Sequence, residues 1–180
     1  MTESLDKLSK RLNDTQDFCH SVSGYLKEGF LIEGKTMEAW KRHFRIKIPD
    51  EINFSTLVQL SQEIMTKYQR AAFYRDSQQV SLAIMEQNKA EKYLAEWNNA
   101  RIETQQKTGK PLAAESCKVA ATLAVKDLEA AISNQKVIHT FWVKTCDTLT
   151  EMRKLIELIG YALSGDARTQ RDFVVRGGEH

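Results

Sequence analysis

Residues 105–111, QQKTGKP, end in the Gly109-Lys110-Pro111 interruption that separates two long stretches of sequence without glycine or proline. One stretch runs from Phe54 to Thr108 and the other from Leu112 to Ile159. Glycine and proline interrupt regular structure more strongly than any other residues, so their absence on both sides favours long helices. It argues against a β-sandwich, a βαβ fold or a loop-rich disulfide scaffold. A tight turn between two long helices predicts an antiparallel helical hairpin.

The first stretch predicts a helix over residues 55–106, because its apolar residues recur at helical spacing. Asn53 or Ser55 can cap its start, since both side chains accept hydrogen bonds from the free N–H groups of a first turn. Arg75-Asp76-Ser77 is a candidate kink or short break. The pattern therefore leaves open whether this region forms one helix or two.

The second stretch predicts a helix over residues 112–163, equal in length to the first. Frequent alanines in its first half permit close helix approach, and its second half carries apolar residues at helical spacing. Ser164-Gly165 is the predicted C-cap, and residues 166–180 beyond it are either a short docking helix or a flexible tail. A hairpin of two equal helices buries little surface for its length, so we expect other helices or other subunits to pack against it.

Residues 4–28 predict another helix, with Ser4 as its N-cap. Its apolar positions recur at alternating spacings of three and four residues, a pattern that fits a coiled-coil seam and equally an amphipathic helix docked on the chain's own core. These positions are Leu5, Leu8, Leu12, Thr15, Cys19, Val22 and Leu26.

Residues 35–48, KTMEAWKRHFRIKI, form the most basic window of the chain. Trp40 and Phe44 are four residues apart and so share one helical face. Basic side chains beside aromatic rings can neutralise phosphates and stack on unpaired bases. The alternative is a short solvated helix whose aromatic rings pack into the core. The candidate nucleic-acid contacts in this window are Lys41, Arg42 and Arg45.

The composition limits the setting of the protein. Lys and Arg total 26 and Asp and Glu total 24, so a net charge of +2 does not by itself indicate a polyanionic partner. The three cysteines show no Cys-x-x-Cys spacing, which fits free thiols in a reduced compartment. No apolar run is long enough to cross a membrane, and the opening residues do not resemble a signal peptide. We expect a soluble cytoplasmic protein without membrane contacts.

No catalytic or metal-binding motif is recognisable. The His-Glu-x-x-His, Walker A and Gly-x-Gly-x-x-Gly patterns are all absent. Cys19 and His20 are adjacent and would point to different faces of a helix, so they cannot form a dyad. The carboxylates are spread as helix-surface charges. We therefore expect a binding protein with no catalytic residue, no metal ligand and no cofactor.

The predicted hairpin tip gathers basic residues against Glu103 and Glu115. One such patch would bind nucleic acid weakly, because affinity grows with the number of phosphates neutralised. Repeated around a symmetric oligomer, the patch would become a ring of positive charge. The alternative is an ordinary solvated turn. The basic residues of this tip are Arg101, Lys107, Lys110 and Lys118.

Two stretches of the chain resemble the UvsY-type recombination mediators of T4-like phages. The run Asn99-Ala100-Arg101-Ile102-Glu103, with Thr108-Gly109 after it, is similar to that family's Lys-Ala-Arg-aliphatic-acidic run before a glycine-containing turn. Phe141-Trp142, followed by Gly160-Tyr161-Ala162-Leu163, is similar to the family's aromatic-Trp pair and later Gly-aromatic-Ala-aliphatic segment. The resemblance covers roughly residues 50–176. Asn99 stands where the family has a lysine.

The resemblance implies a non-enzymatic protein that forms ring-like homo-oligomers and binds single-stranded DNA. Such a protein helps a phage recombinase displace the single-strand-binding protein during DNA recombination and repair in the infected bacterial host. By the same resemblance Arg101 would contact DNA. Five residues would make packing or subunit contacts: Trp142, Leu149, Ile156, Ile159 and Leu163.

The sequence as a whole predicts an all-α fold assembled into a homo-oligomer. A long antiparallel helical hairpin forms the core over residues 49–165, with an N-terminal helical extension over 1–48 and a C-terminal tail over 166–180. The predicted function is that of a single-stranded-DNA-binding recombination mediator. The alternative is a non-enzymatic helical scaffold or adaptor protein that acts through coiled-coil contacts.

Overall fold

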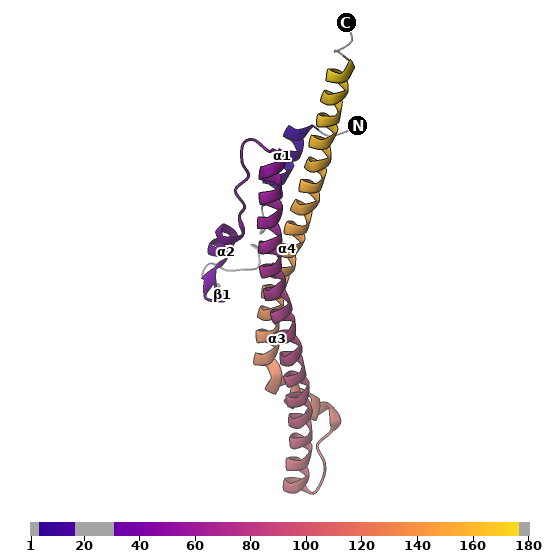
Figure 1. The fold of residues 1–180 in the computed structure, drawn as a ribbon. Helices are drawn as coiled ribbons and strands as arrows, with labels where there is room; N and C mark the ends of the chain where they lie inside the picture. Colours follow the sequence, from indigo (N-terminus) through magenta and orange to yellow (C-terminus); the bar gives the residue numbers. More distant parts are fainter. Residues whose placement is uncertain (1–3, 17–30, 177–180) are drawn as a thin grey trace. The chain divides into compact units, whose positions relative to one another are not determined.

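The computed structural model describes residues 4–16 and 31–176 of the chain, with side chains described up to residue 165. The described part is almost entirely helical, which confirms the predicted all-α class and the long hairpin (Figure 1). The elements, in chain order, are α1 (Leu5–Asp14), β1 (Leu31–Ile32), β2 (Lys35–Thr36), α2 (Met37–Phe44), α3 (Phe54–Thr108) and α4 (Ala114–Arg176).

Helix α3 is a single unbroken helix of 55 residues, so the candidate break at Arg75-Asp76-Ser77 does not occur. Its start is capped by Asn53, whose Oδ1 accepts the N–H of Thr56 at 3.0 Å. Thr56 Oγ1 in return accepts the N–H of Asn53 at 2.8 Å. This reciprocal pair satisfies two N–H groups that the first turn cannot bond internally. The predicted cap at Asn53 is confirmed.

Helix α4 continues to Arg176 and is 63 residues long, so the predicted C-cap at Ser164-Gly165 is wrong. The Ser164 hydroxyl donates to the Gly160 carbonyl oxygen at 2.9 Å, one turn back within the helix, and does not end it. A single glycine inside a helix costs only about 1 kcal/mol relative to alanine, which the neighbouring turns can absorb. The two long helices are therefore unequal in length.

The turn between α3 and α4 lies at the predicted position. Gly109 has a φ of 71°, in the left-handed region where only glycine is unstrained. Its N–H donates to the Gln105 carbonyl oxygen at 2.9 Å and closes the last turn of α3. Pro111, two residues later, cannot continue a helix.

The chain divides into two compact units. The terminal unit comprises residues 1–74 and 141–180, and the turn unit comprises residues 75–140. Each unit contains a segment of α3 and a segment of α4, and each has its own set of buried side chains.

An aromatic cluster forms the core of the terminal unit. Trp142 of α4 is 0% exposed and stacks on Tyr74 of α3, with ring centroids 4.6 Å apart. Trp40 of α2 meets Trp142 edge to face at 5.0 Å, and Phe44 and Phe141 complete the cluster at 5.8 and 4.9 Å from Trp142. These contacts fix α2 against α3 and α4.

A short hairpin precedes α2 and positions it. Strands β1 and β2 pair antiparallel, with Leu31 opposite Thr36. The two residues between the strands, Glu33 and Gly34, both have positive φ, which is the backbone of a type I′ hairpin turn. Trp40 Nε1 then donates to the carbonyl oxygen of Ile32 at 2.7 Å, so the hairpin also holds the indole in the core.

Helix α1 ends at Asp14, earlier than the predicted helix over 4–28. Thr15 closes it, because both its N–H and its hydroxyl donate to the Arg11 carbonyl oxygen. Leu8 and Leu12 are buried, so the start of the predicted seam packs on the chain's own core. The remaining seam positions, Cys19, Val22 and Leu26, lie outside the described residues.

The turn unit has a narrow core of small and medium side chains on α4: Cys117, Ala121, Val125 and Ile132. Polar contacts between the helices flank it. Lys89 pairs with Glu129 at 2.7 Å, Lys136 pairs with Glu86 at 2.8 Å, and Gln135 is hydrogen-bonded to Gln78. The hydrogen bond and charge of Lys136 lower the pKa of Glu86. These pairs fix which residues of α3 and α4 face each other.

In the terminal unit the two long helices approach closely at Gly160 of α4. A Cβ atom at this position would lie 3.2 Å from Leu57 Cδ2 of α3, tighter than ordinary van der Waals contact. The glycine therefore permits the helix–helix distance observed here. At Gly165, five residues further along, an added Cβ would meet nothing within 4 Å.

Candidate nucleic-acid interface

The four basic residues predicted for the hairpin tip all lie in the turn unit and are all exposed. Arg101 and Lys107 occupy the last two turns of α3, Lys110 lies in the turn, and Lys118 is near the start of α4. We call these four residues the tip cluster. All four cations thus lie around one turn and within 17 positions of one another in the sequence.

Two carboxylates accompany the tip cluster but do not neutralise it. Lys107 Nζ lies 3.5 Å from Glu103 Oε2, and Lys118 Nζ lies 3.6 Å from Glu115 Oε1. Both pairs are long contacts between well-exposed side chains, which typically contribute less than about 1 kcal/mol. A phosphate group can therefore replace either carboxylate as the partner of its lysine.

Trp97 adds an aromatic ring to this surface. The Arg101 guanidinium carbon lies 5.6 Å from the centroid of the Trp97 ring, at the one-turn spacing that places both side chains on one helix face. Trp97 is partly exposed. Trp97 is not among the binding residues predicted from the sequence, and its one-turn spacing from Arg101 is the signal that makes it a candidate binding residue. A cation and a ring side by side can contact a phosphate and an unstacked base together.

The candidate basic residues of the α2 region lie in the terminal unit, and the two large aromatic rings of α2 are buried. Trp40 is 2% exposed and Phe44 1%, so neither ring is accessible for stacking on bases. The packing interpretation of these two aromatic residues is confirmed. Arg42 and Arg45 are exposed and Lys41 is half-buried.

A second group of cations, absent from the predictions, gathers around His43 at the end of α2. Arg70 Nη1 of α3 lies 3.0 Å from His43 Nε2. Lys67 of α3 donates to the Arg45 carbonyl oxygen at 2.5 Å, and Lys35 Nζ of β2 sits 4.6 Å above the Trp40 ring. We call Lys35, His43, Lys67 and Arg70 the His43 cluster.

The charges of the His43 cluster are nearly all positive. Burial, followed by the charges of Arg70, Lys35 and Lys67, lowers the pKa of His43. Glu63 pairs with Lys67 at 2.9 Å, but within the described part of the chain no ion pair joins Lys35 or Arg70 to a carboxylate. Three permanent cations therefore face one neutral imidazole and one carboxylate.

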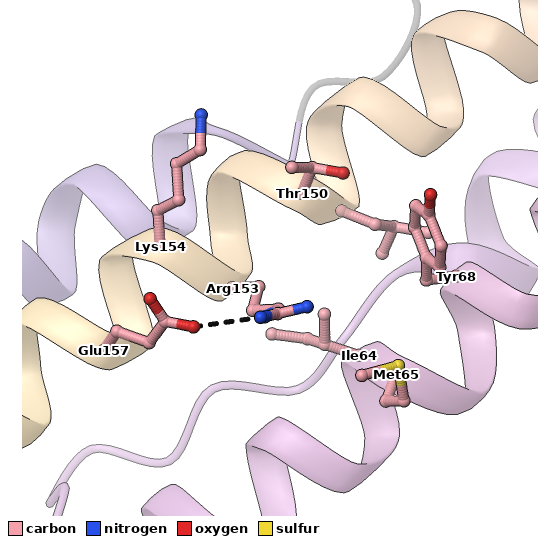
Figure 2. A pocket seen from close by; sticks show the side chains of 8 residues that line it. Ile64, Met65, Tyr68, Thr150, Arg153, Lys154 and Glu157 are labelled. Carbon is pink, nitrogen blue, oxygen red and sulfur yellow. Dashed lines mark hydrogen bonds and ion pairs between the residues drawn. The ribbon is translucent and has the colours of Figure 1, made fainter.

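A shallow hollow of about 360 Å³ lies between α3 and α4 in the terminal unit. Figure 2 shows Ile64, Met65 and Tyr68 of α3 across from Arg153 of α4. Arg153 is paired with Glu157 at 3.1 Å. Lys154 is paired with Glu151 at 2.6 Å, so each charged group of this hollow has a partner within α4. These pairs leave a half-apolar surface rather than a set of convergent polar groups.

The five residues predicted to make packing or subunit contacts all lie on α4 in the terminal unit. Trp142, Leu149, Ile156 and Ile159 are buried within the single chain, and Leu163 is half-buried. The Trp142 Nε1 atom is buried and has no hydrogen-bond partner among the described residues. Packing alone therefore holds this indole in place.

The described residues provide no group of three or more His, Cys, Asp and Glu side chains placed to hold a metal ion. None of the described helices carries an apolar stretch sufficient to cross a membrane. The chain matches no protein-family model, no curated protein and no solved structure.

Proposed function

We propose that this protein binds single-stranded DNA and acts as a non-enzymatic recombination mediator that helps load a recombinase onto DNA covered by single-strand-binding protein. The observation that carries the DNA-binding part is the tip cluster, four exposed cations around one turn with Trp97 beside Arg101. The mediator part rests on the resemblance of the runs around Arg101 and Trp142 to UvsY-type proteins. The resemblance and the tip geometry thus both support the proposal, and Arg101 is common to the two.

The tip cluster suits single strands better than a duplex. The lysines and Arg101 would neutralise backbone phosphates, and Trp97 would accept the face of an unpaired base. A duplex offers no free base face to such a ring. One chain makes few contacts, so several tip clusters in a homo-oligomer would be needed for tight binding.

The test is the salt dependence of binding to fluorescently labelled oligo-dT, measured by anisotropy. Four phosphate contacts predict a slope of log K against log salt of about −2.8 per chain, which is about a 50-fold loss of affinity between about 50 and about 200 mM salt. Replacing Arg101 and Lys107 by alanine should reduce this slope by about 1.4. The matched control removes two other exposed lysines of the turn unit, Lys92 and Lys126, and should leave the slope nearly unchanged.

Two results would overturn this proposal. Absence of any affinity for oligo-dT at about 50 mM salt, where phosphate contacts are strong, would exclude single-strand binding. Equal loss of affinity in the Arg101/Lys107 variant and the Lys92/Lys126 variant would show that the tip cluster is not the site.

A scaffold or adaptor function is the second candidate, and the exposed apolar residues of the turn unit favour it. Six large apolar side chains there are more than half exposed: Val80, Ile84, Leu94, Ile102, Val119 and Leu123. Such faces on long helices are typical of coiled-coil contacts. Replacing Val119 and Leu123 by serine should then weaken association with itself or a protein partner, while nucleic acid makes no difference.

A further inference from the structure

We propose that the His43 cluster is a second phosphate-binding site, which takes the sugar–phosphate backbone of a single strand through Lys35, His43 and Arg70. The identification of the ligand as single-stranded DNA rests on the proposed function, whereas the assignment of a phosphate site does not. It assigns a ligand contact to the terminal unit, whereas the tip cluster lies in the turn unit.

The cluster carries more positive than negative charge. Lys35 comes from β2, and Lys67 and Arg70 come from α3, so two elements bring three cations to the His43 ring of α2. Glu63 forms an ion pair with Lys67 but not with Lys35 or Arg70. Like charges held together raise the energy of the free protein, and a bound anion would convert that repulsion into attraction.

A hydrogen bond joins Arg70 to His43. A guanidinium group has only donors, so the Nε2 atom that lies 3.0 Å from Arg70 Nη1 must be the acceptor. The imidazole proton is then on Nδ1, where it can be donated to an incoming oxygen. A phosphate oxygen that approaches Arg70 as well would give the guanidinium a stronger, charged acceptor than the ring nitrogen.

Ring contacts hold the His43 side chain in position. The His43 ring lies edge to face against Trp40 and Phe44, with centroids 5.7 and 5.2 Å apart, and both of these rings are buried. Arg45 accepts from Lys67 through its carbonyl oxygen, which ties the end of α2 to α3. The donors are thus held in position before any ligand arrives, which reduces the entropy lost on binding.

The site has a distinctive consequence for pH dependence. Three cations oppose the protonation of His43: Lys35 of β2 and Lys67 and Arg70 of α3. The one carboxylate paired with this group is Glu63, which forms an ion pair with Lys67. The negative charge of a bound phosphate would favour the protonated form of His43, so the complex would take up a proton at this residue. Affinity should therefore rise as the pH falls through the usual range of imidazole, by at most tenfold per pH unit for one linked proton.

The experiment measures oligo-dT affinity between about pH 8 and about pH 5.5 at constant ionic strength, a range in which histidine titrates. Thymine and phosphodiester groups do not change charge in this range. The wild type should bind several-fold more tightly at the acid end, and His43→Gln should lose this gain while it retains salt-dependent binding through the tip cluster. Arg70→Gln should weaken binding several-fold more than Lys144→Gln, which removes an exposed lysine outside the cluster in the same unit. A His43→Gln variant with the pH dependence of the wild type would overturn the proposal and leave the proposed function standing.

A second measurement separates this site from the proposed function. The NMR signal of the His43 ring is followed against pH with and without inorganic pyrophosphate. A rise in the pKa of His43 on addition of pyrophosphate supports a phosphate site even if oligo-dT does not bind, in which case only the proposed function fails. An unchanged pKa overturns the site.

Discussion

Trp142→Ala is the perturbation that tests the core of the terminal unit most severely. Trp142 is fully buried among Trp40, Phe44, Tyr74 and Phe141. Truncation of a buried tryptophan to alanine typically costs about 3–5 kcal/mol. The four ring contacts, each of about 0.5–1.5 kcal/mol beyond area burial, place this site at the upper end of that range. No hydrogen bond is lost, because the indole N–H has none among the described residues, so the cost is one of packing.

Urea unfolding followed by circular dichroism measures this cost. With an m-value of about 2 kcal/mol per M, a loss of about 4–5 kcal/mol lowers the midpoint by about 2 M. Tyr161→Ala is the matched control, since Tyr161 lies on the same helix and is 76% exposed. Its effect should stay within about 0.5 kcal/mol.

The same experiment distinguishes packing within the chain from contacts between subunits. Unfolding is repeated over a range of protein concentrations, because stability that depends on association changes with concentration. A Trp142→Ala midpoint within about 0.5 M of the wild type, together with a loss of native mass, would refute the assignment of Trp142 to the core of a single chain. We expect the reverse: a large loss of stability at every concentration.

Three further predictions concern stability measured by urea unfolding. Asn53→Ala should cost about 1 kcal/mol because a helix cap is lost, whereas Ser55→Ala should cost less than about 0.5 kcal/mol; equal costs would contradict the assignment of the cap. Gly160→Val should destabilise by about 1–3 kcal/mol through overpacking, and Gly165→Ala should stabilise by up to about 1 kcal/mol through helix propensity; a fully stable Gly160→Val variant would exclude the close helix approach. The pKa of His43 is lowered in the folded chain, so the unfolded chain binds a proton at this residue at a higher pH. Part of the free energy of unfolding is therefore present above the usual imidazole range and is lost as the pH falls through that range. His43→Gln should flatten this part of the pH profile, and an unchanged profile would argue against the partial desolvation and the cationic neighbours that lower the pKa of His43.

Much of the fold follows from local sequence features. The Gly109 turn and the Asn53 cap are signals carried by a few neighbouring residues, and the absence of Gly and Pro is a signal of continuous stretches of the chain. The structure agrees with each of them. The end of α4 shows where local reasoning fails. Ser164-Gly165 has the composition of a helix end, but the serine bonds back into the helix. Whether a helix ends is decided by the residues beyond it as well as by the cap candidates.

The candidate interface was predictable only where its residues are close in sequence. The tip cluster belongs to a single turn, so its members could be grouped from spacing alone. The His43 cluster joins residues up to 35 positions apart, through the docking of α2 on α3 by the aromatic core. No pattern within the sequence places Arg70 beside His43. The aromatic residues of α2 show the same limit, because helical spacing alone does not distinguish a buried ring from a binding ring.

We propose that this chain is a homo-oligomer that binds single-stranded DNA. Light scattering coupled to size-exclusion chromatography, with and without oligo-dT, tests both parts in one measurement. We expect a native mass that is a multiple of 20.6 kDa and that increases when oligo-dT co-elutes with the protein. A mass of 20.6 kDa, unchanged by oligo-dT that elutes separately, would contradict it.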